Sequence, residues 1–75
     1  MWTTGSTTVN GIVIHYCIKH YEEPSELYGI NGGRISKLSL KQSGRIVTNY
    51  DRGWDVKPET KEAEIALGIL LEKYN

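Results

Sequence analysis

An alternating run of side chains directly after an Asn-Gly pair constrains the fold most. Asn10-Gly11 is the dipeptide type that most readily adopts positive φ at both central positions of a tight hairpin turn. It joins a strand at residues 6–9 to a longer strand at residues 12–21, which is rich in β-branched and aromatic residues. Successive side chains of a strand point to opposite faces. We therefore expect one face to lie in the core, with Ile12, Ile14, Tyr16 and Ile18, and the other to carry Val13, His15, Cys17 and Lys19.

The middle of the chain predicts two further strands. Residues 22–26 contain a proline and three glutamates, which end the long strand, and a glycine-rich loop leads to a strand at residues 34–41. Leu38 and Leu40 share a face, but Ile35 is out of phase with them, which predicts a bulge near residues 33–36. A turn at residues 42–45 then leads to a strand at 46–50, and residues 51–55 form another turn.

The last part of the chain predicts one helix. Pro58 suits the first turn of a helix, and apolar residues then recur at spacings of three and four: Ala63, Ala66, Leu67, Leu70, Leu71 and Tyr74. The predicted fold class is α+β, a four-stranded antiparallel β-meander (β-β-β-β-α) with one C-terminal helix packed on one sheet face. The expected core consists of Ile14, Tyr16, Ile18, Leu38, Leu40, Leu67, Leu70 and Leu71.

The length of the chain predicts a single domain, residues 1–75. A domain of this size buries only about 60% of the surface that its unfolded chain exposes. Cys17 is the only cysteine, so no disulfide within the chain adds stability, and we expect a homo-oligomer to supply further burial. The unpaired cysteine, the absence of a signal-peptide pattern and the absence of a long apolar segment predict a cytoplasmic protein without membrane contact.

Neither catalysis nor metal binding has a signature in the sequence. His15, Cys17 and His20 are residue types that bind zinc, but in a strand His20 points away from the other two. No serine or threonine lies in a strand–turn–helix elbow of the kind that exposes a nucleophile. We therefore expect a protein that is not an enzyme and that has no metal and no cofactor.

The glycine-rich loop Tyr28-Gly-Ile-Asn-Gly-Gly-Arg34 is the main candidate for a binding site. Successive backbone N–H groups around its glycines can form an anion-binding nest, and an arginine fork can bind phosphate. Aromatic rings nearby can stack on a planar base. The residues that we predict to bind a phosphorylated nucleotide-like ligand or a host protein are Tyr28, Asn31, Gly32, Gly33, Arg34, Arg52 and Trp54. A purely structural interpretation also exists, in which the glycines only let the chain turn and bulge into the next strand.

The charge distribution supports a second hypothesis. Net charge is zero overall, but residues 1–57 carry seven basic and five acidic side chains, whereas residues 58–75 carry two basic and four acidic ones. Residues 34–45 contain four basic side chains and no acidic one. An exposed sheet face with Lys37, Lys41 and Arg45 is the alternative site, for nucleic acid. A third hypothesis is an assembly protein without a ligand, whose second sheet face is an oligomer interface.

Residues 28–38, together with Tyr50-Asp-Arg-Gly53 and the closing helix, resemble a family of small uncharacterised proteins of Gram-positive bacteria and their phages. The resemblance covers most of the chain, and the family carries no activity to transfer. It implies a short accessory protein encoded by a phage or prophage. Proteins of that kind act by binding, and they include counter-defence proteins that block a host protein or sequester a nucleotide signal.

Overall fold

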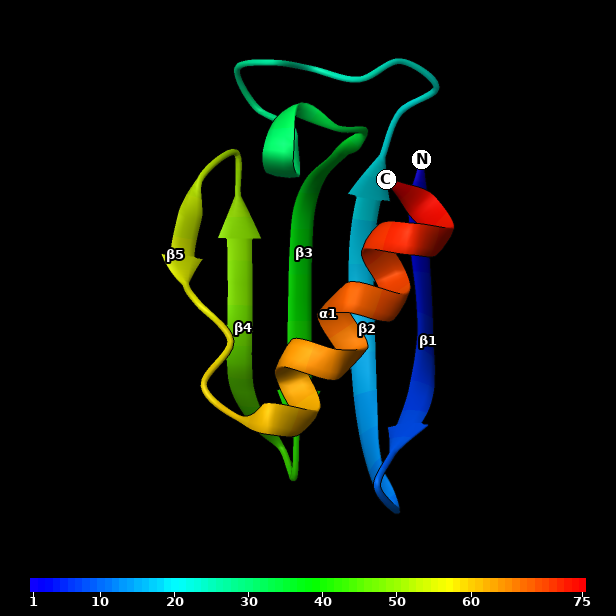
Figure 1. Cartoon of the computed structure of the whole chain (residues 1–75), viewed down its shortest axis with the longest axis vertical. Helices are drawn as coiled ribbons and strands as arrows, with labels where there is room; N and C mark the ends of the chain where they lie inside the picture. Colours follow the sequence, from blue (N-terminus) through cyan, green and yellow to red (C-terminus); the bar gives the residue numbers. More distant parts are fainter.

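The computed structural model describes every residue from Met1 to Asn75. Five antiparallel strands form one sheet in chain order, β1-β2-β3-β4-β5, and a single α-helix lies across one face of it (Figure 1). The α+β class, the antiparallel meander and the C-terminal helix on one sheet face are confirmed. The predicted number of strands is wrong, because the sheet has five strands and not four.

The elements and their bounds are β1 (Trp2–Val9), β2 (Ile12–His20), the short 3-10 turn η1 (Ile30–Gly32), β3 (Ile35–Gln42), β4 (Arg45–Asp51), β5 (Trp54–Val56) and α1 (Lys61–Tyr74). The first strand is longer than predicted, since its pairing with β2 continues back to Trp2, opposite Lys19. The fifth strand lies where a turn was expected. That turn is confined to Arg52 and Gly53, after which the chain returns alongside β4.

Two bulges set which side chains enter the core. Lys19 pairs with Lys37 and His20 with Ile35, so Ser36 is the extra residue of β3 and lies within the predicted segment. This bulge brings Ile35 into phase with the leucines of β3. A second bulge, at Val47 of β4, was not predicted. It buries two consecutive residues completely, Val47 and Thr48, and the Thr48 hydroxyl is satisfied by the Val47 carbonyl at 2.8 Å.

The core lies between the sheet and α1, which crosses β1, β2 and β3 diagonally (Figure 1). All eight predicted core residues belong to it: Ile14, Ile18, Leu38, Leu40 and Leu70 are buried, while Tyr16, Leu67 and Leu71 are half-buried and pack against them. Ile30, from the glycine-rich loop, is also completely buried. The loop is therefore anchored to the core by one of its own side chains.

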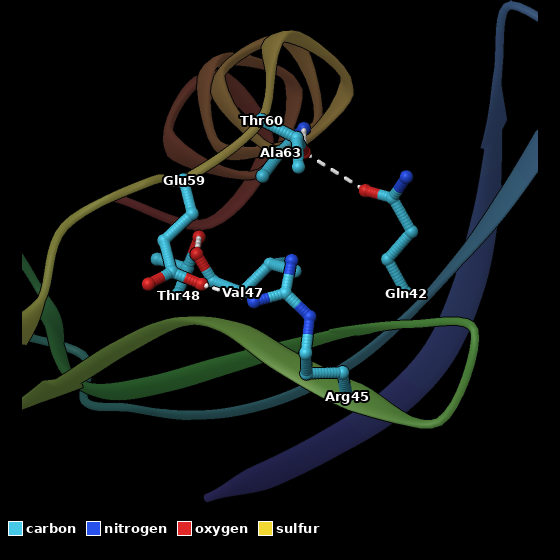
Figure 2. A network of polar contacts seen from close by, with 7 residues as sticks. All are labelled: Gln42, Arg45, Val47, Thr48, Glu59, Thr60 and Ala63. Atoms are coloured by element: carbon cyan, nitrogen blue, oxygen red, sulfur yellow. Dashed lines mark hydrogen bonds and ion pairs between the residues drawn. The ribbon is translucent and has the colours of Figure 1, made fainter.

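The start of α1 is fixed by polar contacts. Thr60 is the N-cap: its hydroxyl accepts a hydrogen bond from the Ala63 N–H at 3.0 Å and donates one to Gln42 at 2.8 Å (Figure 2). The sequence predicted Pro58 in the first turn of the helix. This is wrong, because Pro58 precedes the N-cap residue Thr60. Glu59 binds Arg45 through a contact of 2.9 Å, which ties the segment before the helix to β4. With 14 residues, α1 is too short to cross a membrane, and no longer helix is present.

Candidate functional site

A pocket of about 400 Å³ opens where β2 and β3 meet the loop of residues 21–34 and the β4–β5 turn. Nine residues line it: Lys19, Tyr21, Ser25, Tyr28, Gly29, Arg34, Ser36, Lys37 and Arg52. Four of them are cationic, two are tyrosines, two are serines, and none is acidic. A concave site of this size suits a small molecule rather than the flat surface of a large partner.

The positive charges of the pocket are only partly compensated. Asp51 is the one carboxylate that pairs with them, and its Oδ1 lies 3.6 Å from Lys37 Nζ and 3.7 Å from Arg52 Nε. Lys19 and Arg34 take part in no ion pair. Lys19 and Lys37 are also direct neighbours across β2 and β3, and like charges in that position destabilise a sheet. A bound anion would remove this repulsion.

Two of the four pocket cations, Lys19 and Arg52, lie close to aromatic rings. Lys19 Nζ lies 5.6 Å from the ring centroids of both Trp2 and Tyr21, and the Arg52 guanidinium lies 6.0 Å from that of Tyr28. Cation–π contacts of this kind hold the charged groups near the rings. Tyr21 and Tyr28 remain 48% and 51% exposed, so the rings are accessible to a planar ligand.

The glycine-rich loop frames the pocket, but its backbone donors are used internally. The Gly32 N–H donates to the Gly29 carbonyl at 3.0 Å, and the Gly33 N–H donates to the Ile30 carbonyl at 2.8 Å. These two groups are therefore not available for the anion-binding nest that the sequence predicts. Asn31 and Gly32 adopt positive φ, 52° and 71°, which gives the loop its tight turn. This positive φ at Gly32 agrees with the interpretation in which the glycines let the chain turn into the next strand.

Asn75, directly after α1, holds the loop in place. Its side-chain amide donates to the Ile30 carbonyl at 3.0 Å and accepts from the Ile35 N–H at 2.9 Å. Its backbone oxygen accepts from Arg34 Nε at 3.4 Å. A Cβ at Gly33 would overlap this side chain, so glycine is required for the contact. The end of the helix thus positions both the loop and the arginine that lines the pocket.

The seven residues predicted for the ligand site separate into three groups. Tyr28, Arg34 and Arg52 line the pocket. Asn31, Gly32 and Gly33 support it from within the loop without lining it. Trp54 lies outside, with its ring edge-on to that of Tyr50 at a centroid distance of 5.1 Å.

The three residues of the alternative nucleic-acid site do not form one surface. Lys37 and Lys41 lie four residues apart on the same helix-free face of β3, opposite Lys19 and His15 of β2, and Lys37 also lines the pocket. Arg45 lies at the far end of the sheet and reaches toward the start of the helix, where it binds Glu59 (Figure 2). Two of the three predicted residues, Lys37 and Lys41, therefore share one sheet face, and Arg45 is directed away from it.

Sequence reasoning missed six of the pocket's nine residues as ligand-site candidates. Lys37 was assigned only to the alternative site, and Gly29 lies in the candidate loop but was not named as a ligand residue. The remaining four were assigned to no site: Lys19, Tyr21, Ser25 and Ser36. Two signals were present: a lysine and a tyrosine closing the same long strand, and a serine at the predicted bulge. The lining of the pocket offers ammonium, guanidinium and hydroxyl donors, which are groups that bind anions.

One protein family matches the chain, a domain of unknown function designated DUF7678, and the match covers residues 1–75. The chain belongs to the DUF7678 family. No curated protein matches it. No solved structure matches it either. The expected membership of an uncharacterised family is confirmed, and the pocket of this DUF7678 domain is the feature from which its function has to be argued.

The titration of Tyr21 offers a test of the pocket's electrostatics in this DUF7678 domain. Polar contact with Lys19 lowers the pKa of the Tyr21 phenol, and the positive charges of Lys19 and Lys37 act in the same direction. Lys19→Met is therefore expected to raise the pKa of Tyr21 toward its ordinary value. Ultraviolet difference titration of the phenolate, with Tyr21→Phe to identify the signal among five tyrosines, measures the shift. Lys41→Met is the control and should leave the titration unchanged; an equal response to both variants would contradict the local effect.

Proposed function

We propose that this chain is a non-enzymatic binding protein whose pocket holds a small phosphorylated ligand of nucleotide-like chemistry. The observation that carries the proposal is the gathering of four cationic side chains around one pocket with a single paired carboxylate. Arginine binds phosphate through paired N–H donors, and lysine binds it as a point charge. Two exposed tyrosine rings at the same pocket provide surfaces on which a planar base can stack.

A small ligand fits these observations better than a host protein does. The charges and rings converge on a concavity of about 400 Å³ and are not spread over a broad face. A host protein would reach them only by inserting a phosphorylated or acidic side chain. The lining also suits the binding of an anion, because it offers ammonium, guanidinium and hydroxyl donors.

The biological setting is part of the proposal. We infer a short accessory protein of a phage or prophage, of the counter-defence type, that acts in the cytoplasm and sequesters its ligand. The small size of the chain and a pocket equipped for capture support sequestration. Cys17 is unpaired and half-buried, which suits a reducing compartment.

The experiment is a thermal-shift screen of nucleotides, cyclic dinucleotides and inorganic phosphate. A ligand of the proposed class should raise the melting temperature of the wild type, and Arg34→Ala should weaken its affinity by about 10- to 100-fold, because one charge-assisted contact is worth roughly 1.5–3 kcal/mol. Lys41→Ala, outside the pocket, should bind as the wild type does. Arg34→Lys, which keeps the charge but loses the fork, should be intermediate.

Two results would contradict the proposal. One is the absence of any stabilising compound in the screen. The other is a ligand whose affinity is unaffected by Arg34→Ala while the circular dichroism spectrum shows an intact fold. Short DNA and RNA duplexes belong in the same screen, because the alternative function predicts a different order of effects. If the sheet face binds nucleic acid, Lys37→Ala and Lys41→Ala should weaken binding equally, and each should lower the salt slope by about one.

A further inference from the structure

The outer edge of β1 lacks the features that normally keep a sheet edge from pairing. The strand has eight residues, Trp2–Val9, and none of them is charged or proline. Its register with β2 runs without interruption from one end to the other, so no bulge bends it away. Natural proteins protect edges by charges, prolines, bulges or short length. The opposite edge follows that rule, because β5 has only three residues and its pairing with β4 is irregular.

The backbone groups that β1 presents outward can be assigned from its hydrogen bonds. Met1 and His20 exchange both backbone bonds, at 3.0 Å and 2.9 Å. Hydrogen-bonded pairs alternate along an antiparallel ladder, so the odd-numbered residues of β1 bond to β2. The N–H and C=O groups that point away from the sheet belong to Trp2, Thr4, Ser6 and Thr8.

We propose that β1 pairs with β1 of a second copy of this chain, antiparallel about a two-fold axis at Gly5. In this register Trp2 lies opposite the partner's Thr8, and Thr4 lies opposite the partner's Ser6. Every outward N–H and C=O group of both strands then has a partner, which no other register achieves. One sheet continues through both chains, with both helices on the same side. The inference rests on this edge alone and is independent of the pocket.

The side chains favour a second copy over a foreign strand. On the helix-free face Trp2 and Val13 are exposed, by 55% and 45%, at opposite ends of the β1–β2 hairpin. Antiparallel pairing places each Trp2 beside the partner's Thr8, whose neighbour on the next strand is the partner's Val13. On each side of the axis, Trp2 and the partner's Val13 then lie on the same sheet face, with the partner's Thr8 between them. The remaining contacts are between threonines and serines, a favourable type of cross-strand pair, and no like charges face each other.

Sedimentation equilibrium across micromolar to millimolar concentrations of the full chain tests the proposal. The wild type should be a dimer, and Ser6→Pro should raise its dissociation constant at least about 100-fold, since proline removes an outward donor and blocks the approach of the partner. The same substitution should leave the monomer folded, because proline is tolerated on an edge strand where the N–H faces solvent. Ser6→Ala is the matched control and should remain a dimer.

Thr4→Lys gives a second, independent disruption, because it puts a charge on the edge opposite the partner's Ser6. It decides the question if Ser6→Pro fails to fold. A wild type that stays monomeric at millimolar concentration would overturn the proposal. A dimer that persists in a folded Ser6→Pro variant would also overturn it. If Ser6→Pro does not fold, a dimer that persists in Thr4→Lys would overturn it.

Discussion

Leu70→Ala is expected to lower the free energy of unfolding by about 2–5 kcal/mol. Leu70 is 2% exposed and lies on the face of α1 that packs against the sheet, next to Ala66. The two other fully buried residues of the helix are alanines, Ala63 and Ala66, so Leu70 supplies the largest side chain that α1 buries completely. Small domains have only about 5–15 kcal/mol of stability in total, so the loss is a large fraction of it. Urea denaturation followed by circular dichroism measures the change.

Ile69→Ala is the matched control for this prediction. It removes a side chain of the same size from the adjacent position of the same helix, but Ile69 is 44% exposed. Its loss should cost less than about 1 kcal/mol, as most surface substitutions do. The contrast between the two variants reports on which face of α1 docks. Equal losses would contradict the packing that both the sequence and the structure assign to this helix.

The parts of the fold that could be predicted carry their signal in local periodicity. The alternation along β2 and the spacing of three and four along α1 each define a buried face without reference to the rest of the chain. The position of the bulge could be predicted as well. Ile35 is out of phase with Leu38 and Leu40, so it can share their buried face only if one extra residue is inserted between them.

The missed elements have no such local signal. Residues 2–5 show no alternation of apolar and polar side chains. The full length of β1 is therefore defined only by its pairing with β2. The three residues of β5 are too few to show an alternation of apolar and polar side chains. The pairing of β5 with β4 is also irregular, so its side chains do not alternate between the two sheet faces as in a regular strand. Pro58 was placed in the helix because proline suits a first turn, but the Thr60 hydroxyl caps the helix later in the chain.

The candidate site shows the same division. Tyr28, Arg34 and Arg52 were found because aromatic and basic residues flank glycines in the sequence. Lys19 was missed because it reaches the pocket only through the β2–β3 register that sets it against Lys37. The glycines were predicted to offer N–H groups to an anion, but the N–H groups of Gly32 and Gly33 are bonded within the loop. Their importance is architectural, and this can be tested.

Gly29→Ala is expected to disrupt the loop and with it the pocket, at a cost of about 1–3 kcal/mol in the free energy of unfolding. A Cβ at Gly29 would overlap the carbonyl group of Gly33, and backbone cannot move aside as a flexible side chain can. Gly29 also donates to the Ser25 carbonyl at 2.9 Å and lines the pocket directly. Amide hydrogen exchange should show faster exchange at Gly32 and Gly33, whose N–H groups are bonded within the loop in the wild type.

Gly44→Ala provides the control that separates loop geometry from the general cost of replacing a glycine. Gly44 has a φ of 77° and no neighbouring atom within 4 Å of an added Cβ. Its substitution should cost about 1–2 kcal/mol through backbone strain alone, a loss comparable to that of Gly29→Ala. The two variants should nevertheless differ at the loop: Gly44→Ala should retain slow exchange at Gly32 and Gly33 and the ligand response of the wild type. If Gly29→Ala retains both as well, the loop does not shape the pocket, and the assignment of Gly29 to its wall is wrong.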